Sequence, residues 1–221
     1  MDVQDRDGKE RRLGRIIGRL LAEQLTRLLE EVVEDDDTVN FDSLPPDFWD
    51  TEVERFVRAL SPEQQRIFLE QAEAMLAQVS IGVEWGQINE WAVEWARNYT
   101  YDLVTGINGT NRSTLQRLIA RSFEEPLTQG ELRELLSGTY SPVRAEMIAR
   151  TEVTRAAVEG ERAFVRGLER QGVQLTPVHA TREDDIVCPI CGPRNEQPIE
   201  RDDQFPPLHP RCRCWVNWET R

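Results

Sequence analysis

The placing of the cysteines constrains this chain more than any other feature, because all four follow residue 187 of a 221-residue sequence. They form a Cys188-x-x-Cys191 pair and, after a gap, the cluster His209-x-x-Cys212-x-Cys214. Two ligands separated by two residues can turn a tight loop onto one metal ion, and two such pairs complete a tetrahedron. The spacing predicts one structural zinc ion per chain, with five candidate ligands.

The identity of the four zinc ligands stays open in the sequence. Cys188, Cys191, His209 and Cys212 make two matched pairs, and Cys214 in place of His209 gives an all-thiolate site. Two disulfides are the alternative, but they need an oxidising compartment and the sequence gives no sign of export. A redox C-x-x-C normally begins a helix, which Gly192-Pro193 disfavours here. We therefore expect a metal site.

Composition and charge limit the classes of partner. Asp and Glu total 40 against 27 Lys and Arg, so the net charge is -13. Proteins that grip nucleic acid neutralise phosphates with basic side chains, and we expect at most weak DNA contact here. The longest apolar run is far shorter than the roughly 18 residues of a membrane span. The basic start, Lys9 to Arg12, leads into an amphipathic stretch. These features predict an intracellular soluble protein without membrane contact.

The N-terminal region, residues 1–40, reads as an amphipathic helix followed by an acidic linker. Apolar residues recur at three- and four-residue steps and form one stripe about six turns long: Leu13, Ile16, Ile17, Leu20, Leu21, Leu25, Leu28, Leu29, Val32 and Val33. The acidic run Glu34–Asp37 predicts a flexible junction before Pro45-Pro46. The stripe can pack on the chain's own core or dock on a partner or a second copy, and both alternatives stay open.

Residues 41–171 show helical signals almost throughout. Ser61, Pro62 and Gln64 predict a helix start, with Ser61 as the N-cap. Trp85, Trp91 and Trp95 mark a second helix that we expect Asn108-Gly109 to end, and large aromatic residues at helical spacing are usually core.

Two further helix starts come later in the same region. Thr128 and Glu131 predict a capping box, and Ser141-Pro142 predict the start of a long helix that Gly172 ends.

Residues 172–221 change character. Val173, Leu175 and Val178 alternate like a strand, and Cys214–Trp218 again looks extended. This module has little apolar content, so we expect the metal to stabilise it. The predicted fold class is mostly α: a helical domain with long helices, then a small C-terminal zinc-binding α/β module built on a β-hairpin.

Catalysis is the less favoured use of the metal. A catalytic zinc keeps one position open for water, and His179 or the acidic patch Glu183–Asp185 could assist it. The surplus of ligands favours a closed site instead, with His179 as an ordinary strand residue and the patch as a solvated turn. We expect no enzyme. The alternative is a metal-dependent nuclease that uses the cluster with His179 or Asp185.

Three motifs taken together resemble one known family. Ile148–Glu152 (IARTE), Asp185–Gly192 (DIVCPICG) and Pro206–Cys214 (PPLHPRCRC) stand in the order and spacing of the Mu F-like phage head-morphogenesis, or minor head, proteins. The resemblance covers roughly Leu115 to Trp215. In one departure, His179 stands where such tails often carry tryptophan. In another, the chain ends soon after the last motif, and we expect no appended effector domain.

The resemblance implies a minor capsid component made with the portal and capsid genes. Such a protein would act in head morphogenesis, virion assembly and DNA packaging or ejection. Its partners would be the portal protein, the major capsid protein or both, with self-association through the N-terminal helix as a further expectation. Its location would be the virion interior near the portal, after assembly in the host cytoplasm. Within the first motif, we expect Arg150 and Glu152 to clamp the helix to the zinc module.

Overall fold

The computed structural model describes residues 3–77, 83–122, 127–181 and 187–220. This part of the chain is mostly helical, as the sequence predicts, with five α-helices and one two-stranded sheet. The helices are α1 (Val3–Val32), α2 (Phe48–Leu76), α3 (Trp85–Ser122), α4 (Gln129–Leu136) and α5 (Pro142–Glu169). The strands are β1 (Leu175–Ala180) and β2 (Trp215–Thr220).

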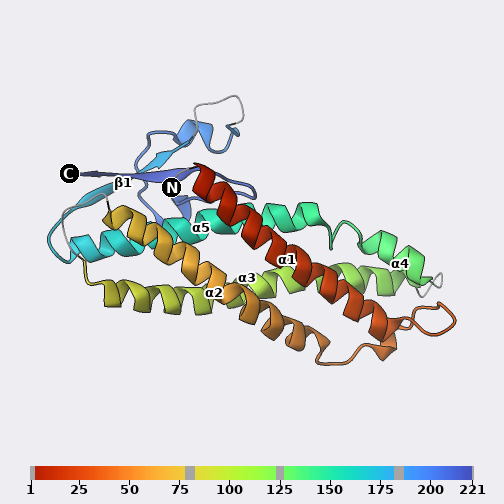
Figure 1. Cartoon of the computed structure of the whole chain (residues 1–221). Helices are drawn as coiled ribbons and strands as arrows, with labels where there is room; N and C mark the ends of the chain where they lie inside the picture. The colour runs from red at the N-terminus through yellow and green to blue at the C-terminus, as the bar shows by residue number, and fades with distance from the viewer. Residues whose placement is uncertain (1–2, 78–82, 123–126, 182–186, 221) are drawn as a thin grey trace.

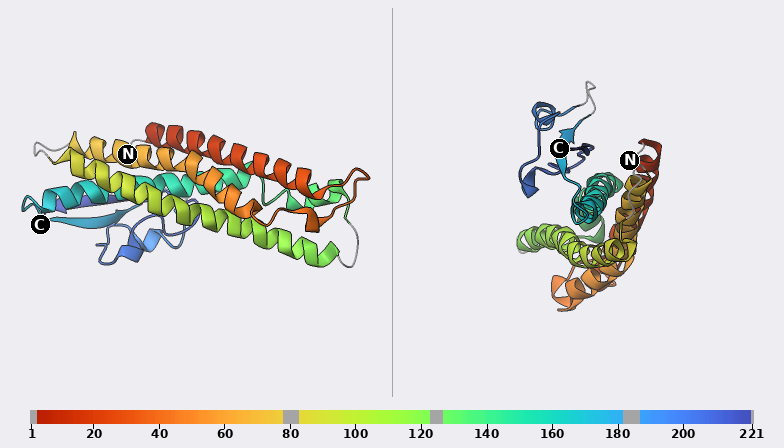
Figure 2. Two further views of the ribbon diagram at one scale, coloured as in Figure 1. Left: turned by 90° about the horizontal axis from the view of Figure 1, so that it is seen from below. Right: turned by 90° about the vertical axis from the view of Figure 1, so that its left-hand side faces the viewer.

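The four long helices lie side by side in an elongated bundle (Figures 1 and 2). Helix α2 packs against α3 and α5, and α1 packs mainly against α5. The short helix α4 lies at one end of the bundle, and the C-terminal module lies against α5 near the beginning of α1 (Figure 1). The beginning of α1 and the C-terminal module therefore lie close to each other (Figure 1).

The apolar stripe of α1 is buried inside the chain's own bundle. Leu13, Ile17, Leu21, Leu28 and Val32 are each 0% exposed and share one core with residues of the other four helices. Of the two alternatives for this stripe, packing on the chain's own core is therefore the one that the structure shows. The exposed side of α1 carries polar and charged residues instead.

The segment after α1 is held by hydrogen bonds and is not the flexible junction that its acidic run suggests. Val33 forms a β-bridge with Val39, and Thr38 forms one with Thr128. The Asn40 side chain then accepts a hydrogen bond from the Asp42 backbone N–H and caps a short 3-10 turn. These contacts fix the path of the chain after α1.

Two predicted helix boundaries are wrong. Helix α2 begins at Phe48 and continues through Pro62, so Ser61 is not its N-cap. Proline costs a hydrogen bond inside a helix, but the residues on either side of it are core: Phe56, Leu60, Ile67 and Phe68 are at most 1% exposed. Packing of the buried face outweighs the local stop signal.

Helix α3 likewise passes through Asn108-Gly109. The Gln24 amide of α1 donates to the Asn108 side-chain oxygen at 2.7 Å, and Asn111 donates to Gln24 in turn. This buried polar contact gives Asn108 a partner in the helical conformation, which a reading of local sequence could not foresee.

Three other local predictions are confirmed. Thr128 and Glu131 form the capping box of α4, and Ser141 caps α5 with Pro142 in its first turn. Gly172 follows α5 with a φ of 87°, a conformation that glycine adopts without steric cost. The chain then turns directly into β1.

The C-terminal module contains an antiparallel pair of strands, β1 and β2, in the register Leu175↔Thr220 to Ala180↔Trp215. Both strands lie where the alternating residues predict them. They are not joined by a tight hairpin, however, because the segment that carries the cysteines lies between them in the sequence. Part of that segment runs along β1, where His179 exchanges backbone hydrogen bonds of 2.9 and 2.8 Å with Gln197 and Glu196.

None of the helices in the described ranges has a stretch long and apolar enough to cross a membrane.

Candidate metal centre

Two backbone turns bring the predicted ligands together. At the first, the N–H groups of Cys191 and Gly192 donate to the Cys188 carbonyl at 3.1 and 2.9 Å. At the second, the Cys212 N–H donates to the His209 carbonyl at 3.1 Å. Each turn presents the first and last residue of its motif on the same side, as the two-residue spacing requires. Leu208 and Val187 pack around the sulfur atoms.

Three of the predicted ligand atoms, those of Cys188, Cys191 and His209, lie within 4.8 Å of one another and could hold one metal ion. His209 Nε2 lies 3.0 Å from Cys188 Sγ and 3.2 Å from Cys191 Sγ, and Cys191 Sγ lies 3.8 Å from Cys212 Sγ. Sulfur atoms bound to one zinc ion at about 2.3 Å stand about 3.8 Å apart. All four cysteines are free thiols, so the structure contains neither of the alternative disulfides.

The His209 ring is oriented for metal binding by its other nitrogen. Nδ1 lies 2.8 Å from the Pro210 carbonyl oxygen and can donate its hydrogen there. That tautomer leaves the Nε2 lone pair directed at the two sulfur atoms. A hydrogen bond of this kind is the usual support of a metal-binding histidine.

His179 is a ligand candidate that the sequence analysis set aside. It lies on β1, as expected, but its side chain is 2% exposed. Its ligand atom groups with those of Cys191 and Cys214, all within 4.8 Å of one another. Neither ring nitrogen has a hydrogen-bond partner within the described ranges. A buried imidazole without partners is costly, and its position beside two sulfur atoms suits a metal ligand.

The electrostatics of the cluster also favour a cation. A hydrogen bond from Cys214 is the main cause that lowers the pKa of Cys212, so this thiol ionises readily. Burial raises the pKa of Cys191 next to it, because a second negative charge there would be poorly solvated. A bound metal ion supplies the positive charge that lets neighbouring thiols ionise together.

Helices α1 and α5 hold the ligand-bearing loop by its backbone. Arg6 of α1 donates to the carbonyl oxygens of Arg213 and Cys212 at 2.8 and 3.2 Å. Thr154 of α5 donates to the same Cys212 carbonyl at 2.8 Å, and the Arg211 N–H donates to Thr151 Oγ1 at 3.0 Å. Four hydrogen bonds thus tie this loop to the two helices.

The expected clamp residues are therefore wrong in part. Glu152 points into the bundle, where it accepts a hydrogen bond of 2.7 Å from the Tyr99 hydroxyl, and burial raises its pKa. Arg150 pairs with Glu146 and with Glu10 of α1. The first motif does contact the module, but through the Thr151 hydroxyl, because the helical period turns this side chain toward the loop.

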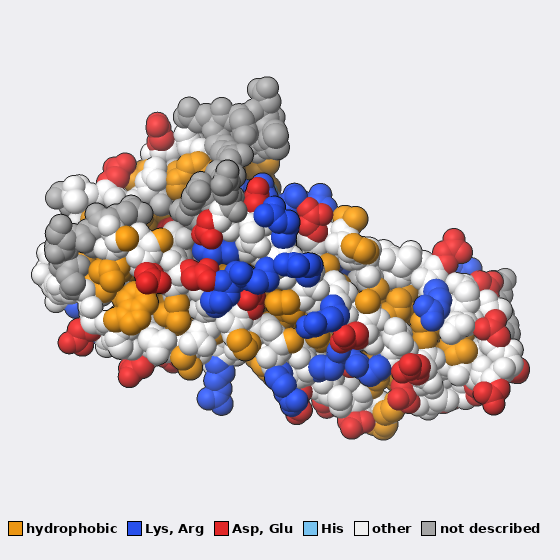
Figure 3. Space-filling view, in the orientation of Figure 1, with side chains coloured by type: hydrophobic (Ala, Val, Ile, Leu, Met, Phe, Trp, Pro, Cys, Tyr) orange, Lys and Arg blue, Asp and Glu red, His pale blue; other side chains and the backbone are white. Residues whose placement is uncertain are grey.

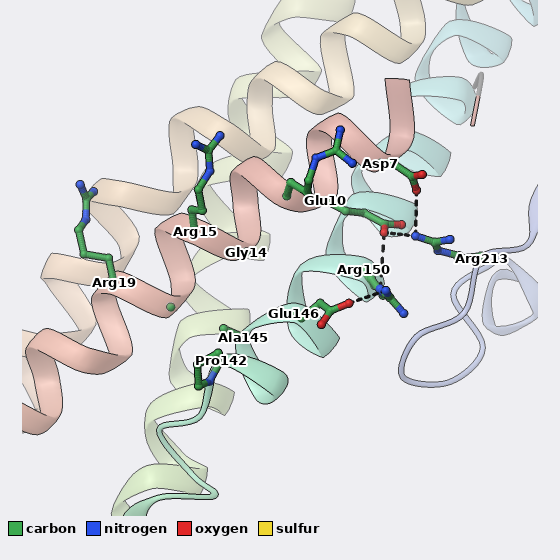
Figure 4. A pocket seen from close by; sticks show the side chains of 12 residues that line it. Asp7, Glu10, Gly14, Arg15, Arg19, Pro142, Ala145, Glu146, Arg150 and Arg213 are labelled. Carbon is green, nitrogen blue, oxygen red and sulfur yellow. Dashed lines mark hydrogen bonds and ion pairs between the residues drawn. The ribbon is translucent and has the colours of Figure 1, made fainter. Parts of the chain in front are cut away.

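Glu10 joins α1, α5 and the module at one point (Figure 4). It is 6% exposed and pairs with Arg6 at 3.1 Å, with Arg150 at 3.7 Å and with Arg213. Beside it a surface cavity of about 570 Å³ opens between α1 and the first turns of α5. Arg15 and Arg19 line its rim and point away from α5 (Figure 4).

The acidic patch Glu183–Asp185, a candidate for assisting catalysis, lies outside the described residues. The metal-binding residues and His179 of the nuclease alternative are among the described residues, whereas Asp185 is not.

The fold and the site together define a helical bundle with a Cys/His module that can hold a metal ion. Comparison with models of protein families, with characterised proteins and with solved structures finds no match for this chain.

Proposed function

We propose that this chain is a structural, zinc-dependent minor head protein of a phage, acting in head assembly in association with the portal. One observation supports this most directly: the three motifs that carry the family resemblance meet in space. Thr151 of the first motif binds the backbone of the third, and Cys191 of the second lies 3.8 Å from Cys212 of the third. Motifs far apart in sequence thus form one unit.

The proposed zinc ion has a structural role. It would be held by Cys188, Cys191, His209 and Cys212. The ion would cross-link two loops that share little apolar core, and its binding free energy would stabilise the folded module. The hydrophobic cluster that joins the module to α5 is small, with Ile199 and Val216 of the module packed against Val158 of the helix. We propose no catalytic activity, since the cluster offers as many protein ligands as a closed site needs.

The proposed portal contact lies on the exposed face of α1. Because the apolar stripe is buried, this face offers charge instead: Arg11, Arg15 and Arg19 are exposed at four-residue spacing, on one side of the helix. Figure 3 shows Lys and Arg side chains gathered across the middle of this side of the molecule. In a chain of net charge -13 such a row is distinctive, and it suits an acidic surface on the portal.

Co-expression with the portal protein of the same phage tests the assignment. We expect the two proteins to co-purify, and the triple variant R11E/R15E/R19E to abolish this while keeping the helical circular dichroism. The matched triple lysine variant should retain most of the binding, because it keeps the charge. The proposal would be contradicted if the folded wild-type chain bound neither the folded portal protein nor the folded major capsid protein.

The nuclease alternative has its own test. Zinc-loaded protein incubated with supercoiled plasmid and magnesium or manganese should leave the plasmid intact. Nicking that persists through further purification and disappears in the Cys188→Ser variant would favour the nuclease over the structural role.

A further inference from the structure

The ligand atoms of the C-terminal module form two overlapping groups. Cys188, Cys191 and His209 make one, and His179, Cys191 and Cys214 make the other, each within 4.8 Å. Cys191 belongs to both. Cys212 is in neither group, but its sulfur lies 3.8 Å from that of the shared Cys191 and has Cys214 as a hydrogen-bond partner.

We propose that the module binds two zinc ions that share the thiolates of Cys191 and Cys212. The first ion is held at its other two positions by Cys188 and His209, and the second by His179 and Cys214. Two tetrahedral ions offer eight coordination positions, and six side chains fill them if two thiolates bridge. This inference rests on the zinc centre proposed above and adds a second ion and a sixth ligand, His179, to it.

Burial agrees with the bridging role. The shared residues, Cys191 and Cys212, are 2% and 1% exposed and are the most deeply buried of the four cysteines. Cys188 and His209 lie on the partly exposed side of the cluster, and His179 and Cys214 lie on the side of the sheet. The sulfur atoms at the centre therefore have a ligand pair on each side.

The register of β1 and β2 places the second ligand pair, His179 and Cys214, on one face of the sheet. His179 of β1 is opposite Val216 of β2, and Cys214 is two residues before Val216. Residues two apart in an extended chain share a face, so His179 and Cys214 lie diagonally on the same face. The sheet thus presents an imidazole and a thiol toward the central sulfur atoms.

Charge and hydrogen bonding favour two ions over one. Two Zn²⁺ ions balance four thiolates, and the buried cluster becomes neutral. One ion held by Cys188, Cys191, His209 and Cys212 would leave an excess negative charge, with His179 and Cys214 unused beside it. Buried polar groups without partners and unbalanced buried charges are both costly. The second ion removes both costs at once.

The number of zinc ions bound per chain tests this inference. Native mass spectrometry of the full chain, purified under reducing conditions with zinc and then freed of loosely bound metal, should show about two zinc ions per chain. One zinc ion in the wild-type chain would overturn this inference and leave the proposed function standing. No zinc at all would overturn the metal centre of both.

Variants assign the two positions. His179→Phe keeps a planar aromatic ring on the strand but removes both nitrogens, and it should lower the content from about two ions to about one, as should Cys214→Ser. Cys188→Ser should also lose one ion, and combining it with His179→Phe should lose both. A His179→Phe variant that keeps two ions would contradict the role given to this histidine, whatever the variant's stability.

Cobalt substitution gives an independent measure of the bridge. Co²⁺ ions that share thiolates couple magnetically, so the electron paramagnetic resonance signal should rise with the first cobalt ion and fall with the second. The signal of His179→Phe should rise to its plateau without falling. Two uncoupled ions in the wild-type chain would rule out shared thiolates.

Discussion

At the scale of single residues, Gly160 sets how closely two helices approach. A Cβ atom at this position of α5 would lie 2.2 Å from the carbonyl oxygen of Phe68 in α2, which is shorter than any contact the backbone can accept. Phe68 is 1% exposed and lies in the core beside Phe164. The absence of a side chain at Gly160 is therefore a packing requirement.

We expect Gly160→Ala to destabilise the chain by roughly 1–3 kcal/mol or more, because α2 and α5 must separate. Gly109→Ala is the matched control, since a Cβ there meets nothing within 4 Å in the middle of α3. It should stabilise the chain by up to about 1 kcal/mol through helix propensity. Urea unfolding of both variants checks this, and equal effects would contradict the close approach.

Glu161, the next residue, is a buried carboxyl group between three elements. Gln71 donates to it at 2.7 Å and Trp218 at 3.3 Å, which links α5 to α2 and β2. Burial raises its pKa from 4.5 to about 7. A carboxyl group with a higher pKa in the folded state favours folding below about pH 4.5, and this contribution is lost as the pH rises toward 7.

The pH dependence of unfolding tests this shift. As the pH rises from about 4.5 to about 7, Glu161→Gln should gain stability relative to the wild-type chain, by up to roughly 3 kcal/mol. Glu169→Gln is the control, because Glu169 is exposed on the same helix. A stability difference between Glu161→Gln and wild type that stays constant over this range would show that the folded pKa is not raised.

At the scale of elements, α1 belongs to the bundle through its apolar face. Leu21 is 0% exposed and Leu20 is 3% exposed, in contact with the core that the other helices share. Substitutions on this face should therefore act on folding before they act on any association.

Leu21→Ala should lower the free energy of unfolding by roughly 2–5 kcal/mol, because it leaves a cavity in the core. Arg15→Ala, on the exposed side of the same helix, should change stability by less than about 0.5 kcal/mol. Thermal unfolding separates the two. If the Leu21→Ala chain is stable but loses self-association or portal binding, the apolar stripe of α1 is an interface and not part of the core.

Arg6 is the contact by which α1 holds the metal-binding loop. We expect Arg6→Met to keep the metal but to speed amide hydrogen exchange at residues 211–214, since the Arg213 carbonyl loses its donor and the Cys212 carbonyl keeps only Thr154. Arg11→Met, on the exposed face of α1, should leave that exchange unchanged. Unaltered exchange in Arg6→Met would show that Thr151 and Thr154 are enough to hold the loop without Arg6.

At the scale of the whole molecule, the chain combines two modes of stabilisation. The bundle has two large apolar clusters, whereas the buried apolar residues of the module besides the Cys/His cluster are few: Val178, Ala180, Ile199 and Val216 are among them. A structural metal ion supplies folding free energy where apolar burial is small.

Removal of metal should therefore unfold the C-terminal module and leave the helical bundle folded. A chelator under reducing conditions should abolish protection from hydrogen exchange in residues 187–214 and leave most of the helical circular dichroism. Cys212→Ser should reproduce this state without a chelator. Loss of the helical signal together with the module would show that the bundle depends on the metal as well.

Patterns among residues close together in the sequence predict much of this structure. The apolar period predicts α1, the capping box predicts α4, and Ser141-Pro142 predicts the start of α5, because caps and periodicity depend on residues within a few positions of one another. The spacing of the cysteines likewise predicts a metal-binding cluster. These features follow from the sequence alone.

Tertiary structure decided what depends on distant partners. Pro62 and Asn108 lie inside helices because packing and the contact with Gln24 outweigh local stop signals. His179 joins the cluster because the strand register puts it on the same face as Cys214, and no local pattern contains that register. The sequence by itself determined which elements form and that the four cysteines and His209 can bind metal. The packing of helices and the pairing of strands decided where those elements end and which ligands meet, because both depend on contacts between residues far apart in the chain.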